Sequence, residues 1–257
     1  MNISLAGRTA IITGGSKGIG LAVAKRFAAS GADVAIVARG QTALDQAVSQ
    51  IGSRGGRIVA IAADVGKAEG VRRAYDGATT AFGKVDILVN NAGTSHRGAF
   101  EGISDETWQE DLDLKLFAAI RLARLAWPQM KERRWGRIIN VLNIGAKAPL
   151  GGSAPTSVSR AAGMALTKVQ ANEGGAHNIL VNALLVGIIE SDQHVQGAAK
   201  AGVPLDQYLA QRTKDAPLGR AGRAEEFANI ACFLASDAGS YITGTAINVD
   251  GGRSPVV

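Results

Sequence analysis

The sequence is poor in the residues that most often build disulfides and metal sites. Its 257 residues contain one cysteine, Cys232, and three histidines, His96, His177 and His194. A single cysteine excludes an internal disulfide, and this usage is typical of a reducing compartment. The histidines are far apart and show no zinc-ligand spacing. We therefore expect a cytoplasmic protein without a metal site.

Long hydrophobic runs are also absent. No apolar stretch reaches the roughly 18 residues that a membrane-spanning helix requires, and the N-terminal residues lead directly into a predicted strand. We therefore expect neither a membrane partner nor a signal peptide. Hydrophobic residues form 46% of the chain and charged residues 19%, which is typical of a globular α/β protein.

Negative charge is in the minority, because 28 Lys and Arg face 22 Asp and Glu and leave a net charge of +6. Binding to nucleic acid would require these cations to cluster. They are scattered, and the densest group, from Lys131 to Arg137, is interrupted by Glu132, Trp135 and Gly136. A solvated helix end explains that group better. We expect no nucleic-acid partner, and a phosphate-bearing small molecule would explain part of the excess.

Short apolar runs alternate with helical patterns along the whole chain. The predicted strands are Thr9–Thr13, Asp33–Ala38, Arg57–Ala62, Val85–Asn90, Arg137–Val141, Ile179–Leu185 and Ala246–Val249. This alternation predicts an α/β fold, a Rossmann-like doubly wound parallel sheet of about seven strands with helices on both faces. No repeat and no Pro/Ser-rich linker interrupts residues 1–257, so we expect a single domain.

Two helical segments carry apolar stripes. The segment from Ser104 to Trp135 has Ser104 as a predicted N-cap and acidic residues in its first turn. Its stripe consists of Leu112, Leu116, Ala119, Ala123, Ala126 and Met130. The helix after Thr156 has a stripe of Val158, Ala162, Ala165 and Val169. Both helices can pack on the sheet, or both can pair with their counterparts in another subunit and form a homodimer or homotetramer.

A glycine-rich turn follows the first predicted strand and leads into an apolar helix. Glycines at this place let the backbone turn sharply and approach a pyrophosphate at the helix N-terminus. The strand before the turn and the helix after it strengthen this interpretation. The predicted dinucleotide site includes Gly14, Ser16, Lys17, Gly18, Ile19 and Gly20.

Further motifs lie where later predicted strands end, which is the edge at which open parallel sheets bind ligands. These motifs are Asp64-Val65, Asn90-Asn91-Ala92-Gly93, Val186-Gly187 and Asn248-Val249-Asp250-Gly251-Gly252. Together with the glycine turn they resemble the short-chain dehydrogenase/reductase family over essentially the whole chain. The C-terminal stretch from Ala216 to Gly244 and Arg160 resemble a divergent 3-oxoacyl-carrier-protein-reductase-like subgroup that lacks the complete catalytic tetrad.

The resemblance implies that these motifs hold a nicotinamide dinucleotide. Asp64 would contact the adenine amine, Ser191 would hold the nicotinamide carboxamide, and Asn90 would stabilise the sheet. The implied cofactor residues beyond the glycine turn are Arg39, Asp64, Val65, Asn91, Ala92, Gly93, Arg160, Gly187, Ile189 and Ser191.

The residues after the second predicted strand favour NADP(H) over NAD(H). Proteins that use NAD place a carboxylate there to hold the ribose 2′-hydroxyl, and this carboxylate would repel a phosphate. Here the strand ends in Val37-Ala38-Arg39 without an acid. Lys17 and Arg39 provide two cations for a 2′-phosphate, and a guanidinium suits bidentate contact with phosphate.

The resemblance also implies four catalytic positions, at which the family has Asn, Ser, Tyr and Lys. Motif spacing places Lys115, Asn143, Thr156 and Arg160 at these positions. A threonine hydroxyl does not ionise near neutral pH, and an arginine cannot release a proton. Asn143 would orient a carbonyl. Lys115 is a titratable replacement whose pKa we expect Arg160 to lower, although it can also be a lysine that reaches solvent from the long helix.

Other side chains are weaker candidates for the chemistry. His96 follows the Asn90–Gly93 motif, where an imidazole can act as an acid or a base, but a loop histidine can equally be a bystander. Glu190, Asp192 and His194 can bind a polar substrate or merely keep their loop hydrated.

Three functions stay open at this point. The first is an NADP(H)-dependent oxidoreductase that acts on a small carbonyl or alcohol with rearranged proton delivery. The second is a catalytically impaired cofactor-binding protein that serves as a sensor or an oligomeric partner. The third is non-redox chemistry, as in halohydrin dehalogenases. It is disfavoured because those relatives keep the serine and tyrosine and lose the dinucleotide glycines, whereas this chain does the reverse.

Overall fold

The computed structural model describes residues 3–52 and 55–257, and its centre is a seven-stranded sheet in the order β3-β2-β1-β4-β6-β8-β9. All neighbouring strands of this sheet are parallel. The strands are β1 (Thr9–Thr13), β2 (Asp33–Ala38), β3 (Ile58–Ala62), β4 (Ile87–Asn90), β6 (Gly136–Asn143), β8 (Ile179–Val186) and β9 (Ala246–Val249). The sheet confirms the predicted doubly wound fold. The strand order reverses direction between β1 and β4, where such sheets bind ligands.

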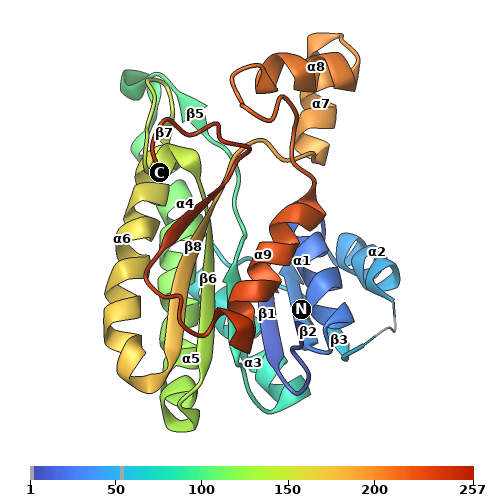
Figure 1. The fold of residues 1–257 in the computed structure, drawn as a ribbon, viewed down its shortest axis with the longest axis vertical. Coiled ribbons are helices and arrows are strands. Elements are labelled where there is room, and N and C mark those ends of the chain that lie inside the picture. The colour runs from blue at the N-terminus through green and yellow to red at the C-terminus, as the bar shows by residue number, and fades with distance from the viewer. Residues whose placement is uncertain (1–2, 53–54) are drawn as a thin grey trace.

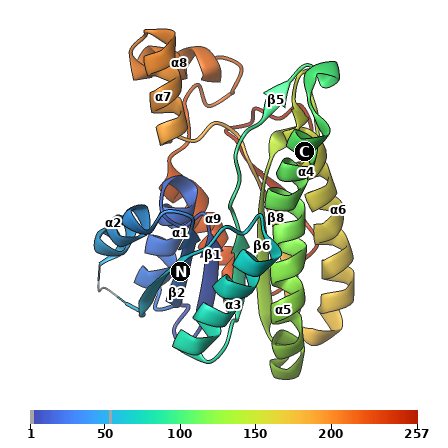
Figure 2. The same ribbon diagram turned by 180° about the vertical axis from the view of Figure 1, so that it is seen from behind.

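Helices cover both faces of this sheet (Figure 1 and Figure 2). They are α1 (Gly18–Ala29), α2 (Gln41–Ile51), α3 (Ala68–Phe82), α4 (Asp105–Leu112), α5 (Ala118–Arg133), α6 (Thr156–Gly174), α7 (Asp192–Ala201), α8 (Leu205–Thr213) and α9 (Ala224–Ala235). The helices α1, α2 and α9 contribute to the hydrophobic core of one face, and α3, α5 and α6 to that of the other. No helix of the described residues is long and apolar enough to cross a lipid bilayer.

Two small features project beyond the edge of the sheet at which the strands end. The helices α7 and α8 follow β8 and stand clear of the other helices (Figure 1). A two-stranded antiparallel ribbon joins β5 (Arg97–Gly98) to β7 (Ala154–Pro155). The ribbon connects the segment after β4 with the segment before α6, so residues distant in sequence meet at this edge.

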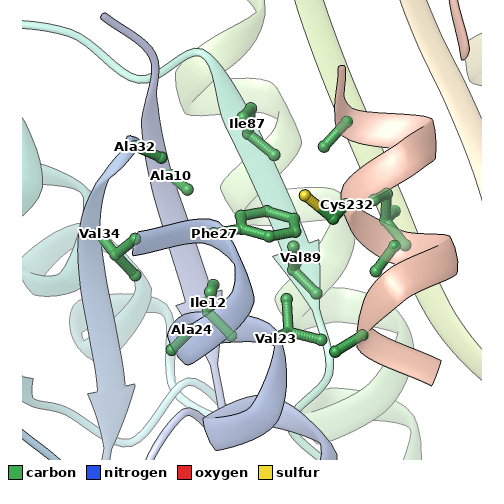
Figure 3. Close-up of a cluster of buried hydrophobic side chains, with 14 of the residues drawn as sticks. Ala10, Ile12, Val23, Ala24, Phe27, Ala32, Val34, Ile87, Val89 and Cys232 are labelled. Atoms are coloured by element: carbon green, nitrogen blue, oxygen red, sulfur yellow. The ribbon is translucent and has the colours of Figure 1, made fainter. Parts of the chain in front are cut away.

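The helices α1 and α9 pack against the sheet in a buried apolar cluster (Figure 3). Phe27 of α1 and Cys232 of α9 are both fully buried in this cluster, together with Val23. Burial raises the pKa of the Cys232 thiol, and its Sγ lies 3.3 Å from Ser30 Oγ. Cys232 therefore lies in an apolar helical setting, and a buried protonated thiol is unreactive.

Several strand ends differ from the prediction by one or two residues. The strands β6 and β8 are longer than predicted, because all eight residues of Gly136–Asn143 pair with Ile179–Val186. Conversely, β3 and β4 begin later than predicted, at Ile58 and Ile87. Arg57 lies outside β3, where its side chain pairs with Asp33 at 2.6 Å. An apolar pattern does not show a contact of this kind.

The long helix predicted for residues 104–135 is interrupted. Its N-cap is confirmed, because the Oγ of Ser104 accepts a hydrogen bond from the Thr107 amide at 3.3 Å. Between α4 and α5, residues Asp113–Phe117 form a π-helical turn, which rotates the following helix against the preceding one. The buried stripe therefore starts only at Ala119 and continues to Met130. The predicted stripe residues Leu112 and Leu116 are half-buried.

The stripe on α6 does not face the sheet. Val158 is 51% exposed and Val169 is 53% exposed. The helix packs inward through its other side, where a Cβ on Gly163 would lie 2.8 Å from Leu142 Cδ2. Of the two alternatives, packing of the stripe on the sheet therefore holds for α5, whose stripe from Ala119 to Met130 is buried, and is wrong for the stripe of α6. The stripe is an apolar surface of the chain.

Candidate active site

The turn after β1 has a backbone path that only glycine supports. Gly14 and Gly18 have φ angles of +66° and +55°, in the left-handed region. A Cβ on Gly20 would lie 2.2 Å from the Gly14 carbonyl oxygen. The Nδ2 of Asn91 donates to the carbonyl oxygens of Thr13 and Gly14 at 2.9 and 3.2 Å. The turn is therefore held against the end of β4.

The N-terminus of α1 opens at this turn. The N-cap is Lys17, and its side chain makes no capping hydrogen bond. The first helical amide to find an intrahelical acceptor is that of Leu21, which donates to the Lys17 carbonyl at 3.3 Å. The amides of Gly18, Ile19 and Gly20 precede it and have no intrahelical acceptor, as in every helix. They form a place that suits an anionic group.

Two cations lie at the ends of neighbouring strands beside this turn. Lys17 follows β1, Arg39 follows β2, and β1 and β2 pair directly. Both side chains are exposed. Neither cation belongs to any of the ion pairs found within residues 3–52 and 55–257. The structure therefore leaves both positive charges available to a ligand.

The segments after β3 and β4 border the same edge. The Oδ1 of Asp64 accepts a hydrogen bond from the Gly66 amide at 3.1 Å, and Val65 is buried in the core. The amide of Ala92 donates to Thr13 Oγ1 at 3.0 Å. As predicted for a sheet residue, the Nδ2 of Asn90 donates to Asn140 Oδ1 at 2.8 Å.

The segment after β8 also lies at the edge of the sheet where the strands end. A Cβ on Gly187 would lie 2.6 Å from Asp250 Cα, so glycine permits a close backbone approach. Ile189 is buried and pairs with Gly222. Ser191 is the N-cap of α7, but its hydroxyl makes no capping hydrogen bond.

The residues suggested for substrate contact, which follow β8, differ in how exposed their side chains are. Glu190 is exposed. His194 is half-buried, and burial, with a contribution from Arg212, lowers its pKa. The side chain of Asp192 lies outside what the structure describes. Among the described residues, no group of three or more His, Cys, Asp or Glu could hold a metal ion.

Lys115 lies in the π-helical turn and points into the protein. Its side chain is 0% exposed, so the alternative that it reaches solvent is wrong. The Nζ donates to the carboxylate of Asp111 and, at 2.7 Å, to Thr156 Oγ1. The π-helical turn is the reason, because it rotates this position toward α6 and away from the outer surface.

The environment of Lys115 lowers its pKa to about 8. Burial is the largest cause, and the positive charges of Arg160 and Arg97 act in the same direction. The hydrogen bond to Asp111 opposes these effects. The predicted direction and the predicted contribution of Arg160 are confirmed, although burial contributes more. A lysine in this state can exchange a proton near neutral pH.

Asp111 completes this cluster and was not predicted from the sequence. Its side chain is 0% exposed, and its Oδ2 accepts a hydrogen bond from Ser159 Oγ at 2.6 Å. A signal was present, because Asp111 lies four residues before Lys115 on the same helix, at the spacing of paired charges. On a regular helix this pattern indicates a solvated ion pair, and only the packing of α6 against it makes the pair buried.

Thr156 and Arg160 lie one turn apart at the start of α6. The hydroxyl of Thr156 donates to the His96 carbonyl oxygen at 2.8 Å, and Arg160 Nη1 donates to the Val141 carbonyl oxygen at 2.7 Å. Burial lowers the pKa of Arg160 to about 10, so it stays cationic at neutral pH. A Cβ on Gly93 would lie 2.5 Å from Arg160 Nη2, which places the guanidinium directly beside the turn after β4.

Asn143 ends β6 and makes no hydrogen bond to the Lys115 cluster in the described part of the chain. Its Oδ1 is buried there without a hydrogen-bond partner. A Cβ on Gly145 would lie 3.1 Å from this oxygen and 2.7 Å from Ser157 Oγ. A buried acceptor without a partner is costly, so this amide is poised to bind a donor.

Comparison with known proteins identifies the family. The family model described as Enoyl-(Acyl carrier protein) reductase matches residues 14–254. The 3-oxoacyl-[acyl-carrier-protein] reductase FabG of Chlamydia pneumoniae is 36% identical over 98% of this chain and 99% of its own length. The chain belongs to the short-chain dehydrogenase/reductase family. This family consists largely of nicotinamide-dependent oxidoreductases, and the predicted resemblance to it is confirmed.

Two further short-chain dehydrogenase/reductase relatives match over nearly the whole chain. Dehydrogenase/reductase SDR family member 4 of Oryctolagus cuniculus is 35% identical over 96% of this chain and 94% of its own length. The L-sorbose reductase of Gluconobacter frateurii, solved in complex with NADPH and L-sorbose, is 36% identical. Its structure superposes with a TM-score of 0.96 and covers 100% of both chains. The shared fold therefore includes the whole edge described above.

Proposed function

We propose that this short-chain dehydrogenase/reductase is an NADP(H)-dependent oxidoreductase that acts on a small carbonyl or alcohol, with Lys115 as its proton donor. The observation that carries the proposal is the buried ammonium of Lys115, which contacts Thr156 and lies beside the cationic Arg160. In this proposal Lys115, Asn143, Thr156 and Arg160 stand at the four catalytic positions of the family.

The residues at the carboxyl edge fit NADP(H). A Cβ on Gly20 or Gly93 would strike neighbouring atoms, so the backbone there is open only because both are glycines. The amides at the start of α1 would hold the pyrophosphate, and Lys17 and Arg39 would hold the 2′-phosphate. The relative solved with NADPH supports a phosphorylated dinucleotide. The remaining proposed cofactor residues are Gly14, Ser16, Gly18, Ile19, Asp64, Val65, Asn91, Ala92, Arg160, Gly187, Ile189 and Ser191.

The catalytic roles beyond cofactor binding are assigned to four side chains. When bound, the reduced nicotinamide supplies the hydride. Lys115 donates the proton that the carbonyl oxygen takes as it becomes an alcohol, which is general acid catalysis. Thr156 holds the ammonium in place by accepting one of its protons. The Asn143 side chain would orient the substrate, with its Nδ2 donating to a carbonyl oxygen and its unpartnered Oδ1 accepting from the hydroxyl of an alcohol. Arg160 would hold a positive charge beside the cofactor's ribose.

The alternative is a catalytically impaired protein that binds NADP(H) as a sensor or an oligomeric partner. One observation favours it, because the hydroxyl of Thr156 is already committed to the His96 carbonyl oxygen and to Lys115. A network whose members satisfy one another is stable without a substrate. The two functions share the cofactor site and differ in turnover.

The exposed stripe on α6 supports a homo-oligomer. Val158 and Val169 each expose more than half of their surface on one face of a long helix. Isolated exposed apolar residues are ordinary, but a contiguous apolar helix face indicates an interface. We propose a dimer or tetramer in which α6 pairs with its counterpart. A single domain, a cytoplasmic location and the lack of nucleic-acid and membrane partners stay predictions.

A titration followed by a turnover assay tests the function. We expect NADPH to bind more tightly than NADH when the two are titrated by nicotinamide fluorescence. We then expect NADPH oxidation with at least one member of a panel of ketones, ketoses and 3-oxoacyl thioesters. Tight NADPH binding without turnover across the panel and across the matching alcohols would support the alternative. Lack of binding of either nucleotide at millimolar concentration would contradict both.

A further inference from the structure

Asp111 is not one of the four proposed catalytic residues, but its carboxylate lies at the centre of the buried cluster that contains Lys115. One oxygen accepts from Lys115, and the other accepts from Ser159 at 2.6 Å. The side chain is fully buried. Burying a carboxylate is costly unless it is paired and hydrogen-bonded. Both requirements are met here. The two hydrogen bonds fix the position of the carboxylate, and the carboxylate in turn fixes the position of the ammonium.

The ammonium of Lys115 keeps one proton that no described residue accepts. An ammonium has three N–H groups, and the structure engages two of them, with Asp111 and with Thr156. The direction of the third is set by the first two. Asp111 therefore determines where the donated proton points, although it does not itself touch the carbonyl.

His96 connects this buried cluster to the surface. Its Nδ1 is buried without a hydrogen-bond partner in the described part of the chain and lies 4.0 Å from Asp111 Oδ1. The imidazole is 41% exposed, so the same ring reaches solvent. The separation exceeds a hydrogen bond by about 1 Å, so the imidazole must move toward Asp111 before it can donate to the carboxylate.

We infer that Asp111 and His96 supply Lys115 with protons: Asp111 is the carboxylate that positions the ammonium and relays the proton, and His96 is the group that exchanges with solvent. The inference rests on the proposed function. The carbonyl carbon takes the hydride with its electron pair, and the oxygen takes a proton from Lys115. The neutral amine then recovers a proton that enters from solvent at His96 and passes through the carboxylate of Asp111. The sum is one carbonyl, one NADPH and one solvent proton converted into one alcohol and one NADP⁺.

The charged and titratable groups around Lys115 and Asp111 come from three elements and one loop. Asp111 lies in α4, Arg160 in α6, Arg97 in β5, and His96 in the segment before β5. The carboxylate favours the ammonium form, whereas both guanidinium groups disfavour it. Removal of the carboxylate charge would leave the amine buried beside two cations. The coupling between Asp111 and Lys115 is therefore measurable without any substrate.

The first experiment follows Lys115 by NMR in the full chain labelled with ¹⁵N-lysine, without cofactor. We expect its titration midpoint at about 8 in the unmodified protein and a fall by about 1–3 pH units in Asp111→Asn. Asp113→Asn is the matched control, because Asp113 lies in the π-helical turn and pairs with Arg121 instead. Equal midpoints in Asp111→Asn and Asp113→Asn would overturn the positioning role.

A measurement on the unmodified protein covers the case in which Asp111→Asn does not fold. The ¹³C resonance of the Asp111 carboxyl must shift at the pH at which Lys115 loses its proton, because the two groups are in direct contact. A carboxyl resonance that is constant through that step would overturn the role. Both NMR tests stay decisive even if no carbonyl compound is reduced.

The second experiment tests His96 by chemical rescue. We expect His96→Ala to lower kcat about tenfold or more, to leave the midpoint of Lys115 nearly unchanged, and to regain kcat when imidazole is added. His177→Ala is the matched control, because His177 lies in the turn before β8, at the opposite edge of the sheet. Unchanged kcat in His96→Ala, or a loss that imidazole does not restore, would overturn the role of His96. Lack of turnover in the unmodified enzyme would instead contradict the proposed function.

Discussion

The Nζ of Lys115 donates to the Oγ1 of Thr156 at 2.7 Å and thereby joins the π-helical turn to the first turn of α6. The contact spans 41 positions of the sequence. It brings a titratable ammonium to a hydroxyl that cannot ionise near neutral pH. The chemistry of the site therefore depends on the lysine rather than on the threonine.

Removal of the ammonium should abolish most turnover without affecting the cofactor. In Lys115→Met we expect kcat to fall by about 10²–10⁴-fold, which is the usual contribution of a general acid. The Kd for NADPH should change little, because the variant keeps the glycine turn and both phosphate cations. Steady-state kinetics and a fluorescence titration measure the two effects. The exposed Lys131→Met is the control, and an equal loss there would contradict the prediction.

The pH dependence should follow the protonation of Lys115. Its pKa is lowered to about 8, and reduction needs the ammonium form. We therefore expect kcat for reduction to be constant below this pH and to fall as the pH rises through about 8. Alcohol oxidation needs the neutral amine and should rise through the same pH. Profiles of kcat in both directions test this, and a reduction rate that rises through pH 8 would exclude Lys115 as the acid.

The two cations beside the glycine turn should decide between the nucleotides. Each charge-assisted contact with a phosphate contributes about 1.5–3 kcal/mol. We expect Lys17→Ala with Arg39→Ala to weaken NADPH binding by about 100-fold or more and to leave NADH binding nearly unchanged. Arg72→Ala, on the exposed surface of α3, is the control. Equal weakening of both nucleotides would mean that the pair does not contact the 2′-phosphate.

A methyl group in the glycine turn should block the cofactor site. The Cβ in Gly20→Ala would lie 2.2 Å from the Gly14 carbonyl oxygen, so the backbone must move. We expect a loss of about 1–3 kcal/mol in the free energy of unfolding and no measurable NADPH binding. Gly175→Ala is the matched control, because a Cβ there meets no atom within 4 Å. Denaturant unfolding and fluorescence titration report the two effects separately, and unchanged NADPH binding in Gly20→Ala would show that the turn does not hold the cofactor.

Charges on the α6 stripe should break the oligomer. We expect Val158→Glu with Val169→Glu to convert a dimer or tetramer into smaller species, because a buried interface does not tolerate unpaired carboxylates. Light scattering after size-exclusion chromatography measures the mass. Val195→Glu is the control, since Val195 is equally exposed at 50% but lies on α7. A monomeric unmodified protein, or an assembly that the double variant does not change, would contradict the proposed interface.

Most of the fold was predictable from the sequence because it depends on local patterns. The strands Thr9–Thr13, Asp33–Ala38 and Ala246–Val249 have the predicted bounds. Burial on both faces makes a strand of a parallel sheet continuously apolar, and the sequence shows this directly. The π-helical turn was not predictable, because residues 104–135 read as one regular helix and nothing local marks the interruption.

The sequence by itself determined the sheet, the glycine turn and the identity of the residues at its carboxyl edge, since each depends on backbone conformation and short spacing. Only the tertiary structure decided which charges are buried. Packing of α6 against the π-helical turn encloses Lys115 and Asp111 and removes them from water. The free energy of a charge depends on all of its surroundings, and these surroundings come from segments that are distant in the sequence.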